Sequence, residues 1–314
     1  MKKLIILIPA YNEEEKIGEV IKNLPKNIDG VSEIKCVVVN DGSGDRTEEL
    51  AKQAGAKVLS HSYNQGVGTA LNTGIDYFLK TDFDLMVNID ADGQFEANEI
   101  KILLKPILEN KADFVAGNRF EEKRPENMPR LKYYGNKMMN KFVGLITGRS
   151  FDDVSCGFRA YNRNALLNLN LFGKFTYTQE TFLDLHFKKI RILQVPISVK
   201  YFTDRKSKVA GNLFKYAYKT ANIIVRSVLY YKPLRFFALP GIFLIVLGLG
   251  FAGFLVWHKL FVGSYSPYKA FGFIGGGLMI FGLLMVLIGF IADMLDKLRQ
   301  NQEKILYLYK KNNK

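Results

Sequence analysis

The sequence predicts an α/β protein with a mostly parallel sheet, followed by a membrane part made of two helices. Over residues 1 to about 120, short apolar segments alternate with segments of helix length, which is the pattern of βαβ units. Near the other end, Leu234–Val256 and Phe271–Ala292 each reach the roughly 20 apolar residues that cross a bilayer core. A sheet domain is therefore expected to precede a hydrophobic helical hairpin.

The first 120 residues supply the elements of the sheet. Strands are expected where Ile, Val and Leu cluster, and helices where apolar residues recur every three to four positions, as Ile17, Val20, Ile21 and Leu24 do. The expected strands are Leu4–Ile8, Ile34–Val39, Lys57–Ser60, Leu85–Ile89 and Asp113–Gly117. The expected helices are Glu14–Leu24, a helix capped by Asp45, Thr69–Leu79 and Asn98–Glu109.

Residues 121–201 lose this regular alternation. Arg130–Ile146 is a basic and aromatic stretch of helical pattern, Thr176–Lys189 is a second expected helix, and Ile192–Tyr201 is an expected strand. A basic loop follows at residues 203–208. We therefore set the end of the sheet domain, 1–208, at this loop.

Residues 209–232 are expected to form amphipathic juxtamembrane helices. Gly211–Tyr231 mixes aromatic and aliphatic residues with lysine and arginine, which is the composition of a helix lying in a membrane interface. An amphipathic helix of a globular domain has the same pattern and remains an alternative. The position directly before an apolar span favours the interface.

The last region, 233–314, is expected to hold both spans and a basic tail. Lysine and arginine are concentrated before the first span and after the second, while the connecting loop carries only Lys259 and Lys269. This bias places the N-terminal domain and both termini in the cytoplasm. Gly272 and Gly276, four residues apart, are expected to let the two helices approach closely.

The N-terminal segment Met1–Pro9 does not have the pattern of a signal peptide. Its apolar run is short, Pro9 ends it, and Glu13–Glu15 follow where a small-residue cleavage site would be. We interpret it as the first strand, which agrees with a cytoplasmic domain.

The composition limits the classes of partner. The chain has 44 Lys+Arg against 30 Asp+Glu, a net charge of +14, which favours an anionic partner such as a membrane surface or a phosphorylated substrate. The cations concentrate around the membrane segments and no nucleic-acid-binding motif accompanies them, so no nucleic acid is expected. Two cysteines and three histidines lack metal-ligand spacing, which argues against a zinc enzyme.

Two closely spaced aspartates follow a strand that is expected to be buried. Leu85–Ile89 leads into Asp90-Ala91-Asp92-Gly93-Gln94. Alternate residues of an extended segment point the same way, so Asp90, Asp92 and Gln94 can share one focus at the carboxyl end of a strand, where α/β sheets bind ligands. Carboxylate and amide oxygens suit a hard divalent cation that shares a diphosphate. A solvated acidic turn is the alternative.

Four segments at these spacings resemble the family 2 glycosyltransferases, which have the GT-A fold. These segments are Ile8-Pro9-Ala10-Tyr11-Asn12-Glu13, Val39-Asn40-Asp41-Gly42-Ser43, Asn64-Gln65-Gly66-Val67-Gly68 and Asp90-Ala91-Asp92-Gly93-Gln94. Asp153-Val-Ser-Cys-Gly-Phe-Arg159, the loop Arg205-Lys206-Ser207-Lys208 and the apolar hairpin are similar to those of the polyprenyl-phosphate glycosyltransferases, which include dolichyl-phosphate mannose synthase.

The resemblance implies a nucleoside site at the ends of the first two strands. Pro9, Tyr11 and Glu13 match a segment that contacts the nucleoside, and Asp41 matches an acid that binds the base or ribose, whose N–H and hydroxyl groups suit a carboxylate. Helix capping is the alternative for Glu13 and Asp41. Gly66 could bring backbone close to the donor, but no dinucleotide or ATP motif is present.

The resemblance also implies a Mg2+ or Mn2+ site. Asp90 matches the first acid of the family's metal motif and is assigned a catalytic role, while Asp92 and Gln94 match direct ligands of the ion. Ala91 is assigned to the same nucleotide-sugar site. The ion would neutralise the departing diphosphate as a Lewis acid.

The acceptor side requires cations. Arg119, Arg130 and Arg205 match arginines that hold phosphates, because guanidinium groups bind phosphate oxygens bidentately. Arg119 and Arg205 are assigned to the donor and to catalysis, and Arg130 to the acceptor phosphate. Ser207 and Lys208 match a loop that closes over the site and are assigned to the acceptor phosphate as well.

Asp153 matches an acid near the reaction centre, where it would orient the acceptor or an arginine. A salt bridge to Arg159 is the alternative.

The implied activity is inverting, metal-dependent transfer of one sugar from a nucleoside-diphosphate sugar, such as GDP-mannose or a UDP-hexose, to a polyprenyl phosphate at the cytoplasmic leaflet. Processive members carry Q-x-x-R-W, whereas this chain has Gln179-Glu-Thr-Phe182. The alternatives are transfer to another lipid or glycan, and a catalytically silent membrane protein that binds nucleotide sugars. The donor base, the sugar, the lipid and the oligomeric state stay open.

Overall fold

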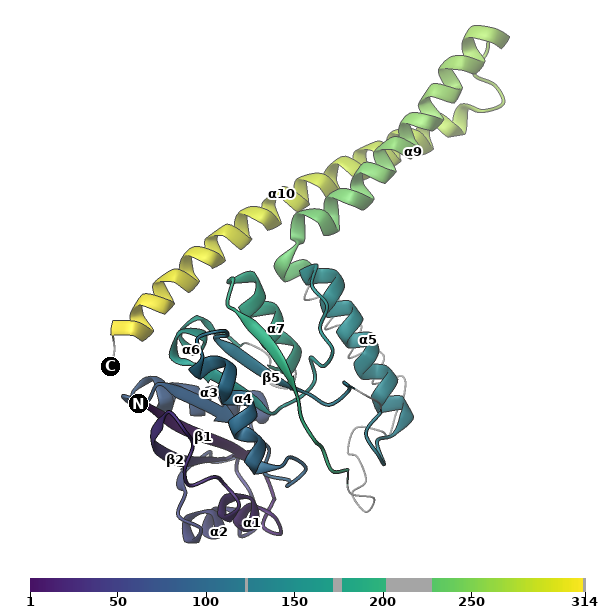
Figure 1. Cartoon of the computed structure of the whole chain (residues 1–314). Helices are drawn as coiled ribbons and strands as arrows, with labels where there is room; N and C mark the ends of the chain where they lie inside the picture. Colours follow the sequence, from purple (N-terminus) through teal and green to yellow (C-terminus); the bar gives the residue numbers. More distant parts are fainter. Residues whose placement is uncertain (122–123, 172–176, 202–227, 313–314) are drawn as a thin grey trace. The chain divides into compact units, whose positions relative to one another are not determined.

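The computed structural model describes residues 1–121, 124–171, 177–201 and 228–312. These residues form a seven-stranded sheet in the order β3-β2-β1-β4-β6-β5-β7, with helices packed on it (Figure 1). The strands are β1 Lys2–Ala10, β2 Val31–Asn40, β3 Lys57–Ser60, β4 Leu85–Asn88, β5 Phe114–Asn118, β6 Arg159–Asn162 and β7 Ile192–Pro196. The predicted α/β class with a mostly parallel sheet is confirmed.

The helices follow the strands in the alternation that the sequence predicts. They are α1 Ile17–Lys22, α2 Thr47–Gln53, α3 Val67–Leu79, α4 Ile100–Leu108, α5 Arg130–Thr147, α6 Arg163–Asn168, α7 Tyr177–Phe187, α9 Pro233–Val262 and α10 Lys269–Asn312. A single 3-10 turn, Ala97–Glu99, leads into α4. Helix α3 packs on β1 and β2, and α4 packs on β5, β6 and β7.

The central strands of the sheet are buried on both faces. Every residue from Leu4 to Ile8 in β1 is fully buried, as a central parallel strand requires. The apolar clusters that mark the strands in the sequence therefore mark the core as well. Hydrophobic burial of this kind, at about 25 cal/mol per Å2 of apolar surface, is the main term that stabilises the domain.

Two elements of the sheet domain were not predicted. Strand β6 and helix α6 lie next to each other in a segment that lost the βαβ rhythm, and β6 is antiparallel to both neighbours, β4 and β5. The sequence Arg159-Ala-Tyr-Asn162 is short and polar at both ends, so its pattern carries little strand signal. Strand β7 also ends at Pro196, five residues before the predicted end at Tyr201.

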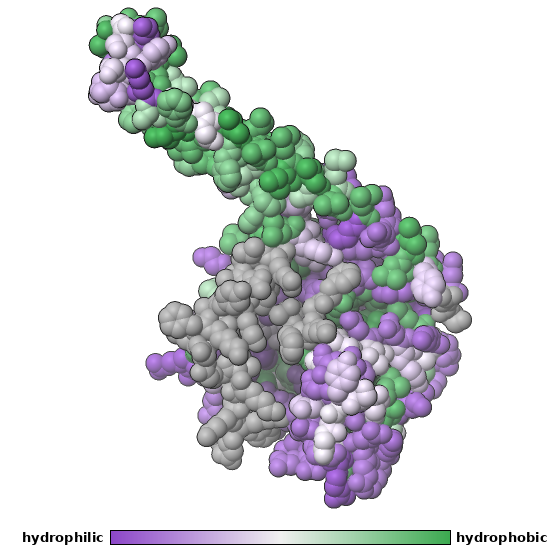
Figure 2. Space-filling model, turned by 180° about the vertical axis from the view of Figure 1, so that it is seen from behind, coloured by the Kyte–Doolittle hydropathy of each residue, from purple (hydrophilic) through white to green (hydrophobic). Residues whose placement is uncertain are grey.

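The chain divides into two compact units, Met1–Gly211 with Ile305–Lys314, and Asn212–Lys304. The predicted juxtamembrane helices, 209–232, lie almost entirely outside the described residues. Helices α9 and α10 carry apolar windows with mean hydropathies of 2.4 and 2.5, of which only 11% is buried, so they are not core helices of a soluble domain. Figure 2 shows their surface as largely hydrophobic.

Glycines spaced by seven residues line the contact between α9 and α10. A Cβ at Gly241 would lie 2.7 Å from the Gly282 carbonyl oxygen, and one at Gly248 would lie 2.6 Å from that of Gly275. Seven-residue spacing keeps one face of each helix against its partner, and the missing side chains let the backbones touch.

The prediction for Gly272 and Gly276 was wrong in part. A Cβ at Gly272 would meet the Leu255 side chain at 3.0 Å, whereas one at Gly276 would meet nothing within 4 Å. The α10 glycines that contact α9 are Gly275 and Gly282. Gly276 is the next residue after Gly275, so a Cβ there points to a different side of α10 and would not contact α9.

Gly275→Val is expected to weaken the hairpin by about 1–3 kcal/mol, because its Cβ would overlap the Gly248 carbonyl oxygen at 2.9 Å. The adjacent Gly276→Val is the matched control, since space is open there. Thermal unfolding of both variants in detergent measures the difference. Equal melting temperatures for the two variants would contradict the seam.

Candidate active site

The predicted site residues follow strands that end at one edge of the sheet. Strands β1, β2, β3, β4, β5 and β7 run in one direction, so their carboxyl ends share an edge, and the antiparallel β6 begins there. The segments that leave this edge contain, in order, Tyr11, Asp41, His61, Asp90, Arg119 and Asp153. The sheet topology thus gathers groups that are up to 142 residues apart in sequence.

Asp41 is engaged by the protein itself. Its carboxylate accepts backbone N–H bonds from Gln65 at 2.9 Å and Gly66 at 2.8 Å, and a contact of 2.7 Å joins it to Nδ1 of His61. The other ring nitrogen of His61 lies 2.9 Å from the Thr73 hydroxyl in α3. In this state Asp41 is 3% exposed and holds the loop that opens α3, rather than facing open solvent.

The loop after β1 is joined to the loop after β2. The Asn12 N–H donates to the Ser43 hydroxyl at 3.0 Å, and the Asn12 side chain accepts from the Gly44 N–H at 2.9 Å. The Glu13 N–H donates to Thr47 at 2.9 Å. Tyr11, between Pro9 and Glu13, is 39% exposed and follows Ala10, whose carbonyl accepts the Asp41 N–H at 2.8 Å.

Gly42 makes a close approach between the loop after β2 and the loop after β3 possible. Its φ of +68° lies in the left-handed region, and a Cβ there would come within 2.4 Å of the Tyr63 carbonyl carbon. The Gly in the Asn40-Asp41-Gly42-Ser43 segment is therefore required by sterics.

Asp90 lies against a backbone cradle. A Cβ at Gly157 would come within 2.9 Å of the Asp90 carboxylate and within 3.2 Å of the Tyr177 hydroxyl, so only glycine leaves room. Two residues on, the Asp92 carboxylate accepts the Gln94 N–H at 3.0 Å, and Gly93 turns the chain with φ of +71°. The Gln94 carbonyl accepts from the Lys200 N–H. The acidic segment thus has a fixed backbone path.

The two carboxylates repel each other. Removal from water, followed by the charge of Asp92, raises the pKa of Asp90 to about 7, against the opposing influence of Arg119, Arg159 and Lys132. The donor set of two carboxylates and an amide fits a hard divalent cation that takes its remaining oxygens from a diphosphate. No group of three or more His, Cys, Asp or Glu side chains with metal-site geometry occurs among the described residues.

Arg119 and Asp153 form a buried ion pair. Arg119 Nε donates to Asp153 at 2.7 Å and Nη2 donates to its other oxygen at 3.0 Å, while Nη1 donates to the Tyr201 hydroxyl at 3.1 Å. The two side chains are 6% and 0% exposed. Burial alone would lower the pKa of Arg119, but Asp153 outweighs this and raises it. Asp153 thus contacts an arginine, Arg119, while its role near the reaction centre stays a prediction.

The alternative salt bridge between Asp153 and Arg159 is not formed. The fully buried Arg159 donates instead to the carbonyls of Cys156 at 2.7 Å, Val154 at 3.2 Å and Thr178 at 2.9 Å. Its charge acts to lower the pKa of Asp90. Arg159 therefore holds the loop that cradles Asp90.

Lys132, in the first turn of α5, is a site residue that sequence reasoning missed. Lys132 is exposed as a residue, but partial burial of its ammonium, followed by repulsion from Arg119, lowers its pKa, whereas Asp92, Asp90 and Asp153 act in the opposite direction. The ammonium lies 4.9 Å from the centroid of the Tyr201 ring. Arg130, chosen from the sequence, begins the same helix with an exposed side chain.

Arg205, Ser207 and Lys208 lie outside the described residues. The segment leading to them is described: Phe95 and Val199 form an isolated antiparallel bridge, and Tyr201 reaches Arg119.

His61 and Tyr201 were also missed, because their partners Asp41 and Arg119 are distant in sequence. A lone His after a strand and a Tyr before a basic loop carry no motif of their own. Their only sequence signal is their position, directly after β3 and directly before the Thr203–Lys208 loop.

Comparison with known proteins gives the family. The family model described as "Glycosyl transferase family 2" matches residues 5–169. Glycosyltransferase AglJ of Haloferax volcanii is 29% identical over 95% of this chain and 95% of its own. A UDP-N-acetylglucosamine–dolichyl-phosphate N-acetylglucosaminyltransferase of Methanococcus voltae is 31% identical over 64% of this chain and 86% of its own. An uncharacterized protein of Methanocaldococcus jannaschii is 38% identical, over 52% of this chain and 66% of its own.

Solved structures have the same fold. Glucosyl-3-phosphoglycerate synthase from Mycobacterium tuberculosis, crystallised with Mn2+, UDP and phosphoglyceric acid, superposes with a TM-score of 0.55 at 20% identity, over 73% of this chain and 78% of that one. The chain belongs to glycosyltransferase family 2, and it is a glycosyltransferase with a GT-A domain.

Proposed function

We propose that this glycosyltransferase moves one sugar from a nucleoside-diphosphate sugar to a polyprenyl phosphate at the cytoplasmic face of a membrane, with inversion and with Mg2+ or Mn2+. The observation that carries the proposal is the meeting of opposite charges at one sheet edge. Asp90 and Asp92 lie within electrostatic reach of Arg119 and Lys132. Relatives named for dolichyl-phosphate or polyprenol-phosphate transfer support this acceptor class.

The donor would lie over the ends of β1, β2 and β4. Tyr11, with Pro9 and Glu13 beside it, offers an aromatic surface for the nucleoside. Asp41 would meet the base or ribose at the mouth of the Gln65–Gly66 loop that it holds. Ala91 would lie under the ribose-diphosphate link, between the two aspartates.

Asp92 and Gln94 would hold the divalent cation, and Asp90 would share its charge. When bound, the ion neutralises the diphosphate leaving group. The donor set supports this, because a carboxylate whose pKa is raised to about 7 by burial, and further by the charge of Asp92, gains from a cation placed beside it.

The acceptor phosphate would enter between Lys132, Arg130 and the Arg119–Asp153 pair. A phosphate monoester carries roughly 1.5 to 2 negative charges at pH 7, so the nucleophile is largely ionised and needs little general-base help. Positioning and charge stabilisation can then supply most of the catalysis. Arg119 uses three of its five N–H groups on Asp153 and Tyr201, and the remaining two can face a phosphate oxygen.

The loop after Tyr201 would complete the site. Arg205, Ser207 and Lys208 come four to seven residues after Tyr201 in the chain, and Tyr201 is hydrogen-bonded to Arg119. We assign Arg205 to the donor diphosphate, and Ser207 and Lys208 to the acceptor phosphate.

Membrane insertion would confine the enzyme to the surface that holds its acceptor. α9 and α10 are long and apolar enough to cross a bilayer, and the distribution of lysine and arginine in the sequence supports a topology with both outer flanks in the cytoplasm. The three proposed regions are the domain 1–208, the juxtamembrane segment 209–232 and the hairpin with its tail, 233–314.

Purified protein incubated with radiolabelled GDP-mannose, UDP-glucose or UDP-N-acetylglucosamine, polyprenyl phosphate and Mn2+ is expected to form a chloroform-soluble sugar lipid. Neutral diacylglycerol in place of the polyprenyl phosphate is the acceptor control. Sugar transfer to diacylglycerol alone, or no transfer from any donor by folded protein, would overturn the proposal.

Asp92→Asn is expected to lower sugar transfer by about a hundredfold or more, because it removes one charged oxygen of the proposed metal site. Isothermal titration with Mn2+ and UDP should show the matching loss of metal-dependent nucleotide binding. Asp76→Asn, on the outer side of α3, is the control. Full activity of Asp92→Asn would remove the metal assignment.

Asp90 is expected to make the metal-free protein less stable as pH rises. Its folded-state pKa is about 7, above the usual value near 4, so its neutral form stabilises the fold below pH 4, and this contribution is lost as pH rises to about 7. Asp90→Asn cannot ionise, so its stability does not fall as pH rises. The variant should be more stable than wild type by about 2 kcal/mol at pH 8, a figure reduced because Asp90 is partly exposed, and equally stable at pH 4. Thermal unfolding in EDTA across this range measures it, and a constant difference would contradict the shift.

Lys132→Gln is expected to lower kcat/KM for the lipid acceptor by about 10- to 100-fold and to leave nucleotide binding nearly unchanged, because its ammonium faces the carboxylate cluster from the acceptor side. Arg130→Gln should have a smaller effect, because Lys132, unlike Arg130, is among the cations whose charge lowers the pKa of Asp90. Lys101→Gln on α4 is the matched control. An equal loss in affinity for UDP would move Lys132 to the donor site.

A further inference from the structure

Helix α5 has two different faces. Its inner face is buried and consists of Gly135, Asn136, Met139, Asn140, Val143 and Ile146. On another side Leu131, Tyr134, Met138 and Leu145 are exposed by 51%, 67%, 51% and 72%. Their spacing of three, four and seven residues places them in one stripe along the helix. We call these four residues the outer stripe.

The charge of α5 is of one sign. Its 18 residues include Arg130, Lys132, Lys137 and Lys141 and contain no aspartate or glutamate. Lys137 and Lys141 lie one turn apart and flank the outer stripe on one side. An exposed apolar stripe bordered by cations alone is the pattern of a helix that lies in an anionic membrane surface.

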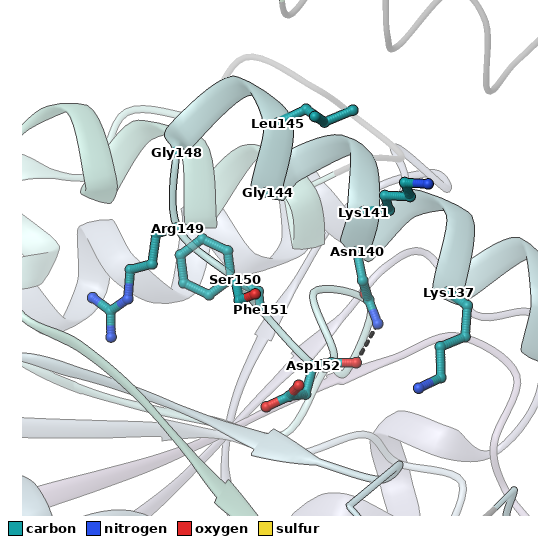
Figure 3. A pocket seen from close by; sticks show the side chains of 10 residues that line it. All are labelled: Lys137, Asn140, Lys141, Gly144, Leu145, Gly148, Arg149, Ser150, Phe151 and Asp152. Carbon is teal, nitrogen blue, oxygen red and sulfur yellow. Dashed lines mark hydrogen bonds between the residues drawn. The ribbon is translucent and has the colours of Figure 1, made fainter.

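A cavity of about 580 Å3 opens beside the C-terminal half of α5 and the loop that follows it. Lys137, Lys141 and Arg149 contribute cations to its lining, and Asp152 contributes a carboxylate. In Figure 3, Lys141 and Leu145 project from the side of α5 that faces away from the sheet, and Arg149 lies across from Lys137. Arg149 Nη2 donates to the Ile192 carbonyl at 2.8 Å, which fixes its guanidinium beside the opening.

The composition favours lipid over protein as the occupant of this face. Lysine is depleted at protein–protein interfaces, whereas basic residues near an anionic bilayer contribute about 1 kcal/mol each. Leucine, methionine and tyrosine at the same level supply the apolar and amphipathic contacts of an interfacial helix.

We propose that the outer stripe of α5 lies in the headgroup region of an anionic bilayer, with Lys137 and Lys141 among lipid phosphates and the adjacent cavity open to a phospholipid headgroup. Because Lys132 is in the first turn of α5, this contact would bring the acceptor side of the site to the depth of the lipid phosphates. The inference rests on the proposed membrane location, but not on the identity of the sugar or acceptor.

Tryptophan fluorescence can test the contact in the full-length protein. Trp257 is the single tryptophan, so Trp257→Phe provides a silent background. Leu145→Trp and Met138→Trp are placed in it, with Ile102→Trp on α4, where the native residue is 44% exposed, as the matched control. Each variant is reconstituted into phosphatidylglycerol-containing vesicles with or without brominated acyl chains.

Leu145→Trp and Met138→Trp are expected to emit at shorter wavelength and to lose about half of their fluorescence to brominated lipid, whereas Ile102→Trp should lose little. Adding Lys137→Gln and Lys141→Gln should reduce the quenching of Leu145→Trp, more at low salt than at high salt. Vesicles of phosphatidylcholine alone should give weaker quenching than the anionic vesicles.

Equal, weak quenching at positions 145, 138 and 102 would overturn the inference. A blue-shifted emission that brominated lipid does not quench, and that is lost when the protein is diluted into excess lipid, would assign the stripe to a second copy of the chain and also overturn it. Sugar transfer by the same variants separates the two proposals: transfer without quenching removes only the docking face, whereas absence of transfer in the Trp257→Phe background challenges the function itself.

Discussion

The site depends on keeping like charges together in a place that water only partly reaches. Asp90 and Asp92 are two residues apart at the end of β4, and their repulsion is offset by Arg119, Arg159 and Lys132. Each of these cations is held by a different part of the chain: Arg119 by Asp153, Arg159 by backbone carbonyls, and Lys132 by the first turn of α5. A binding site for a cation and a diphosphate needs this balance, since an isolated buried carboxylate would simply take up a proton.

Burial also decides which residues hold the site and which are available to substrate. Asp153 is fully buried and forms an ion pair with Arg119. It can therefore affect a substrate only by positioning the Arg119 guanidinium. Both carboxylate oxygens of Asp41 are similarly engaged, by the backbone N–H groups of Gln65 and Gly66 and by the His61 ring. Residues that a motif marks as binding groups thus also build the loops around the ligand.

Much of the fold could be predicted from the sequence because its strands are strongly apolar and its helices are amphipathic. Leu85–Ile89 and Lys57–Ser60 were located to within a residue by this pattern. Strand β6 could not be predicted, because its pairing with β4 and β5 is set by tertiary contacts that a four-residue polar segment does not encode. The acidic cluster was visible as a local motif, whereas Lys132, His61 and Tyr201 act through partners up to 82 residues away, and no local pattern reports such a contact.

The glycine contacts between α9 and α10 have a consequence for how the hairpin can move. Each seam glycine faces a backbone carbonyl of the other helix, and the residues between the glycines are as bulky as phenylalanine, leucine and methionine. Sliding one helix by a single turn would drive those side chains into the space that hydrogen atoms now fill. The pair can therefore tilt or bend as one rod, but its two helices cannot shear past each other in small steps.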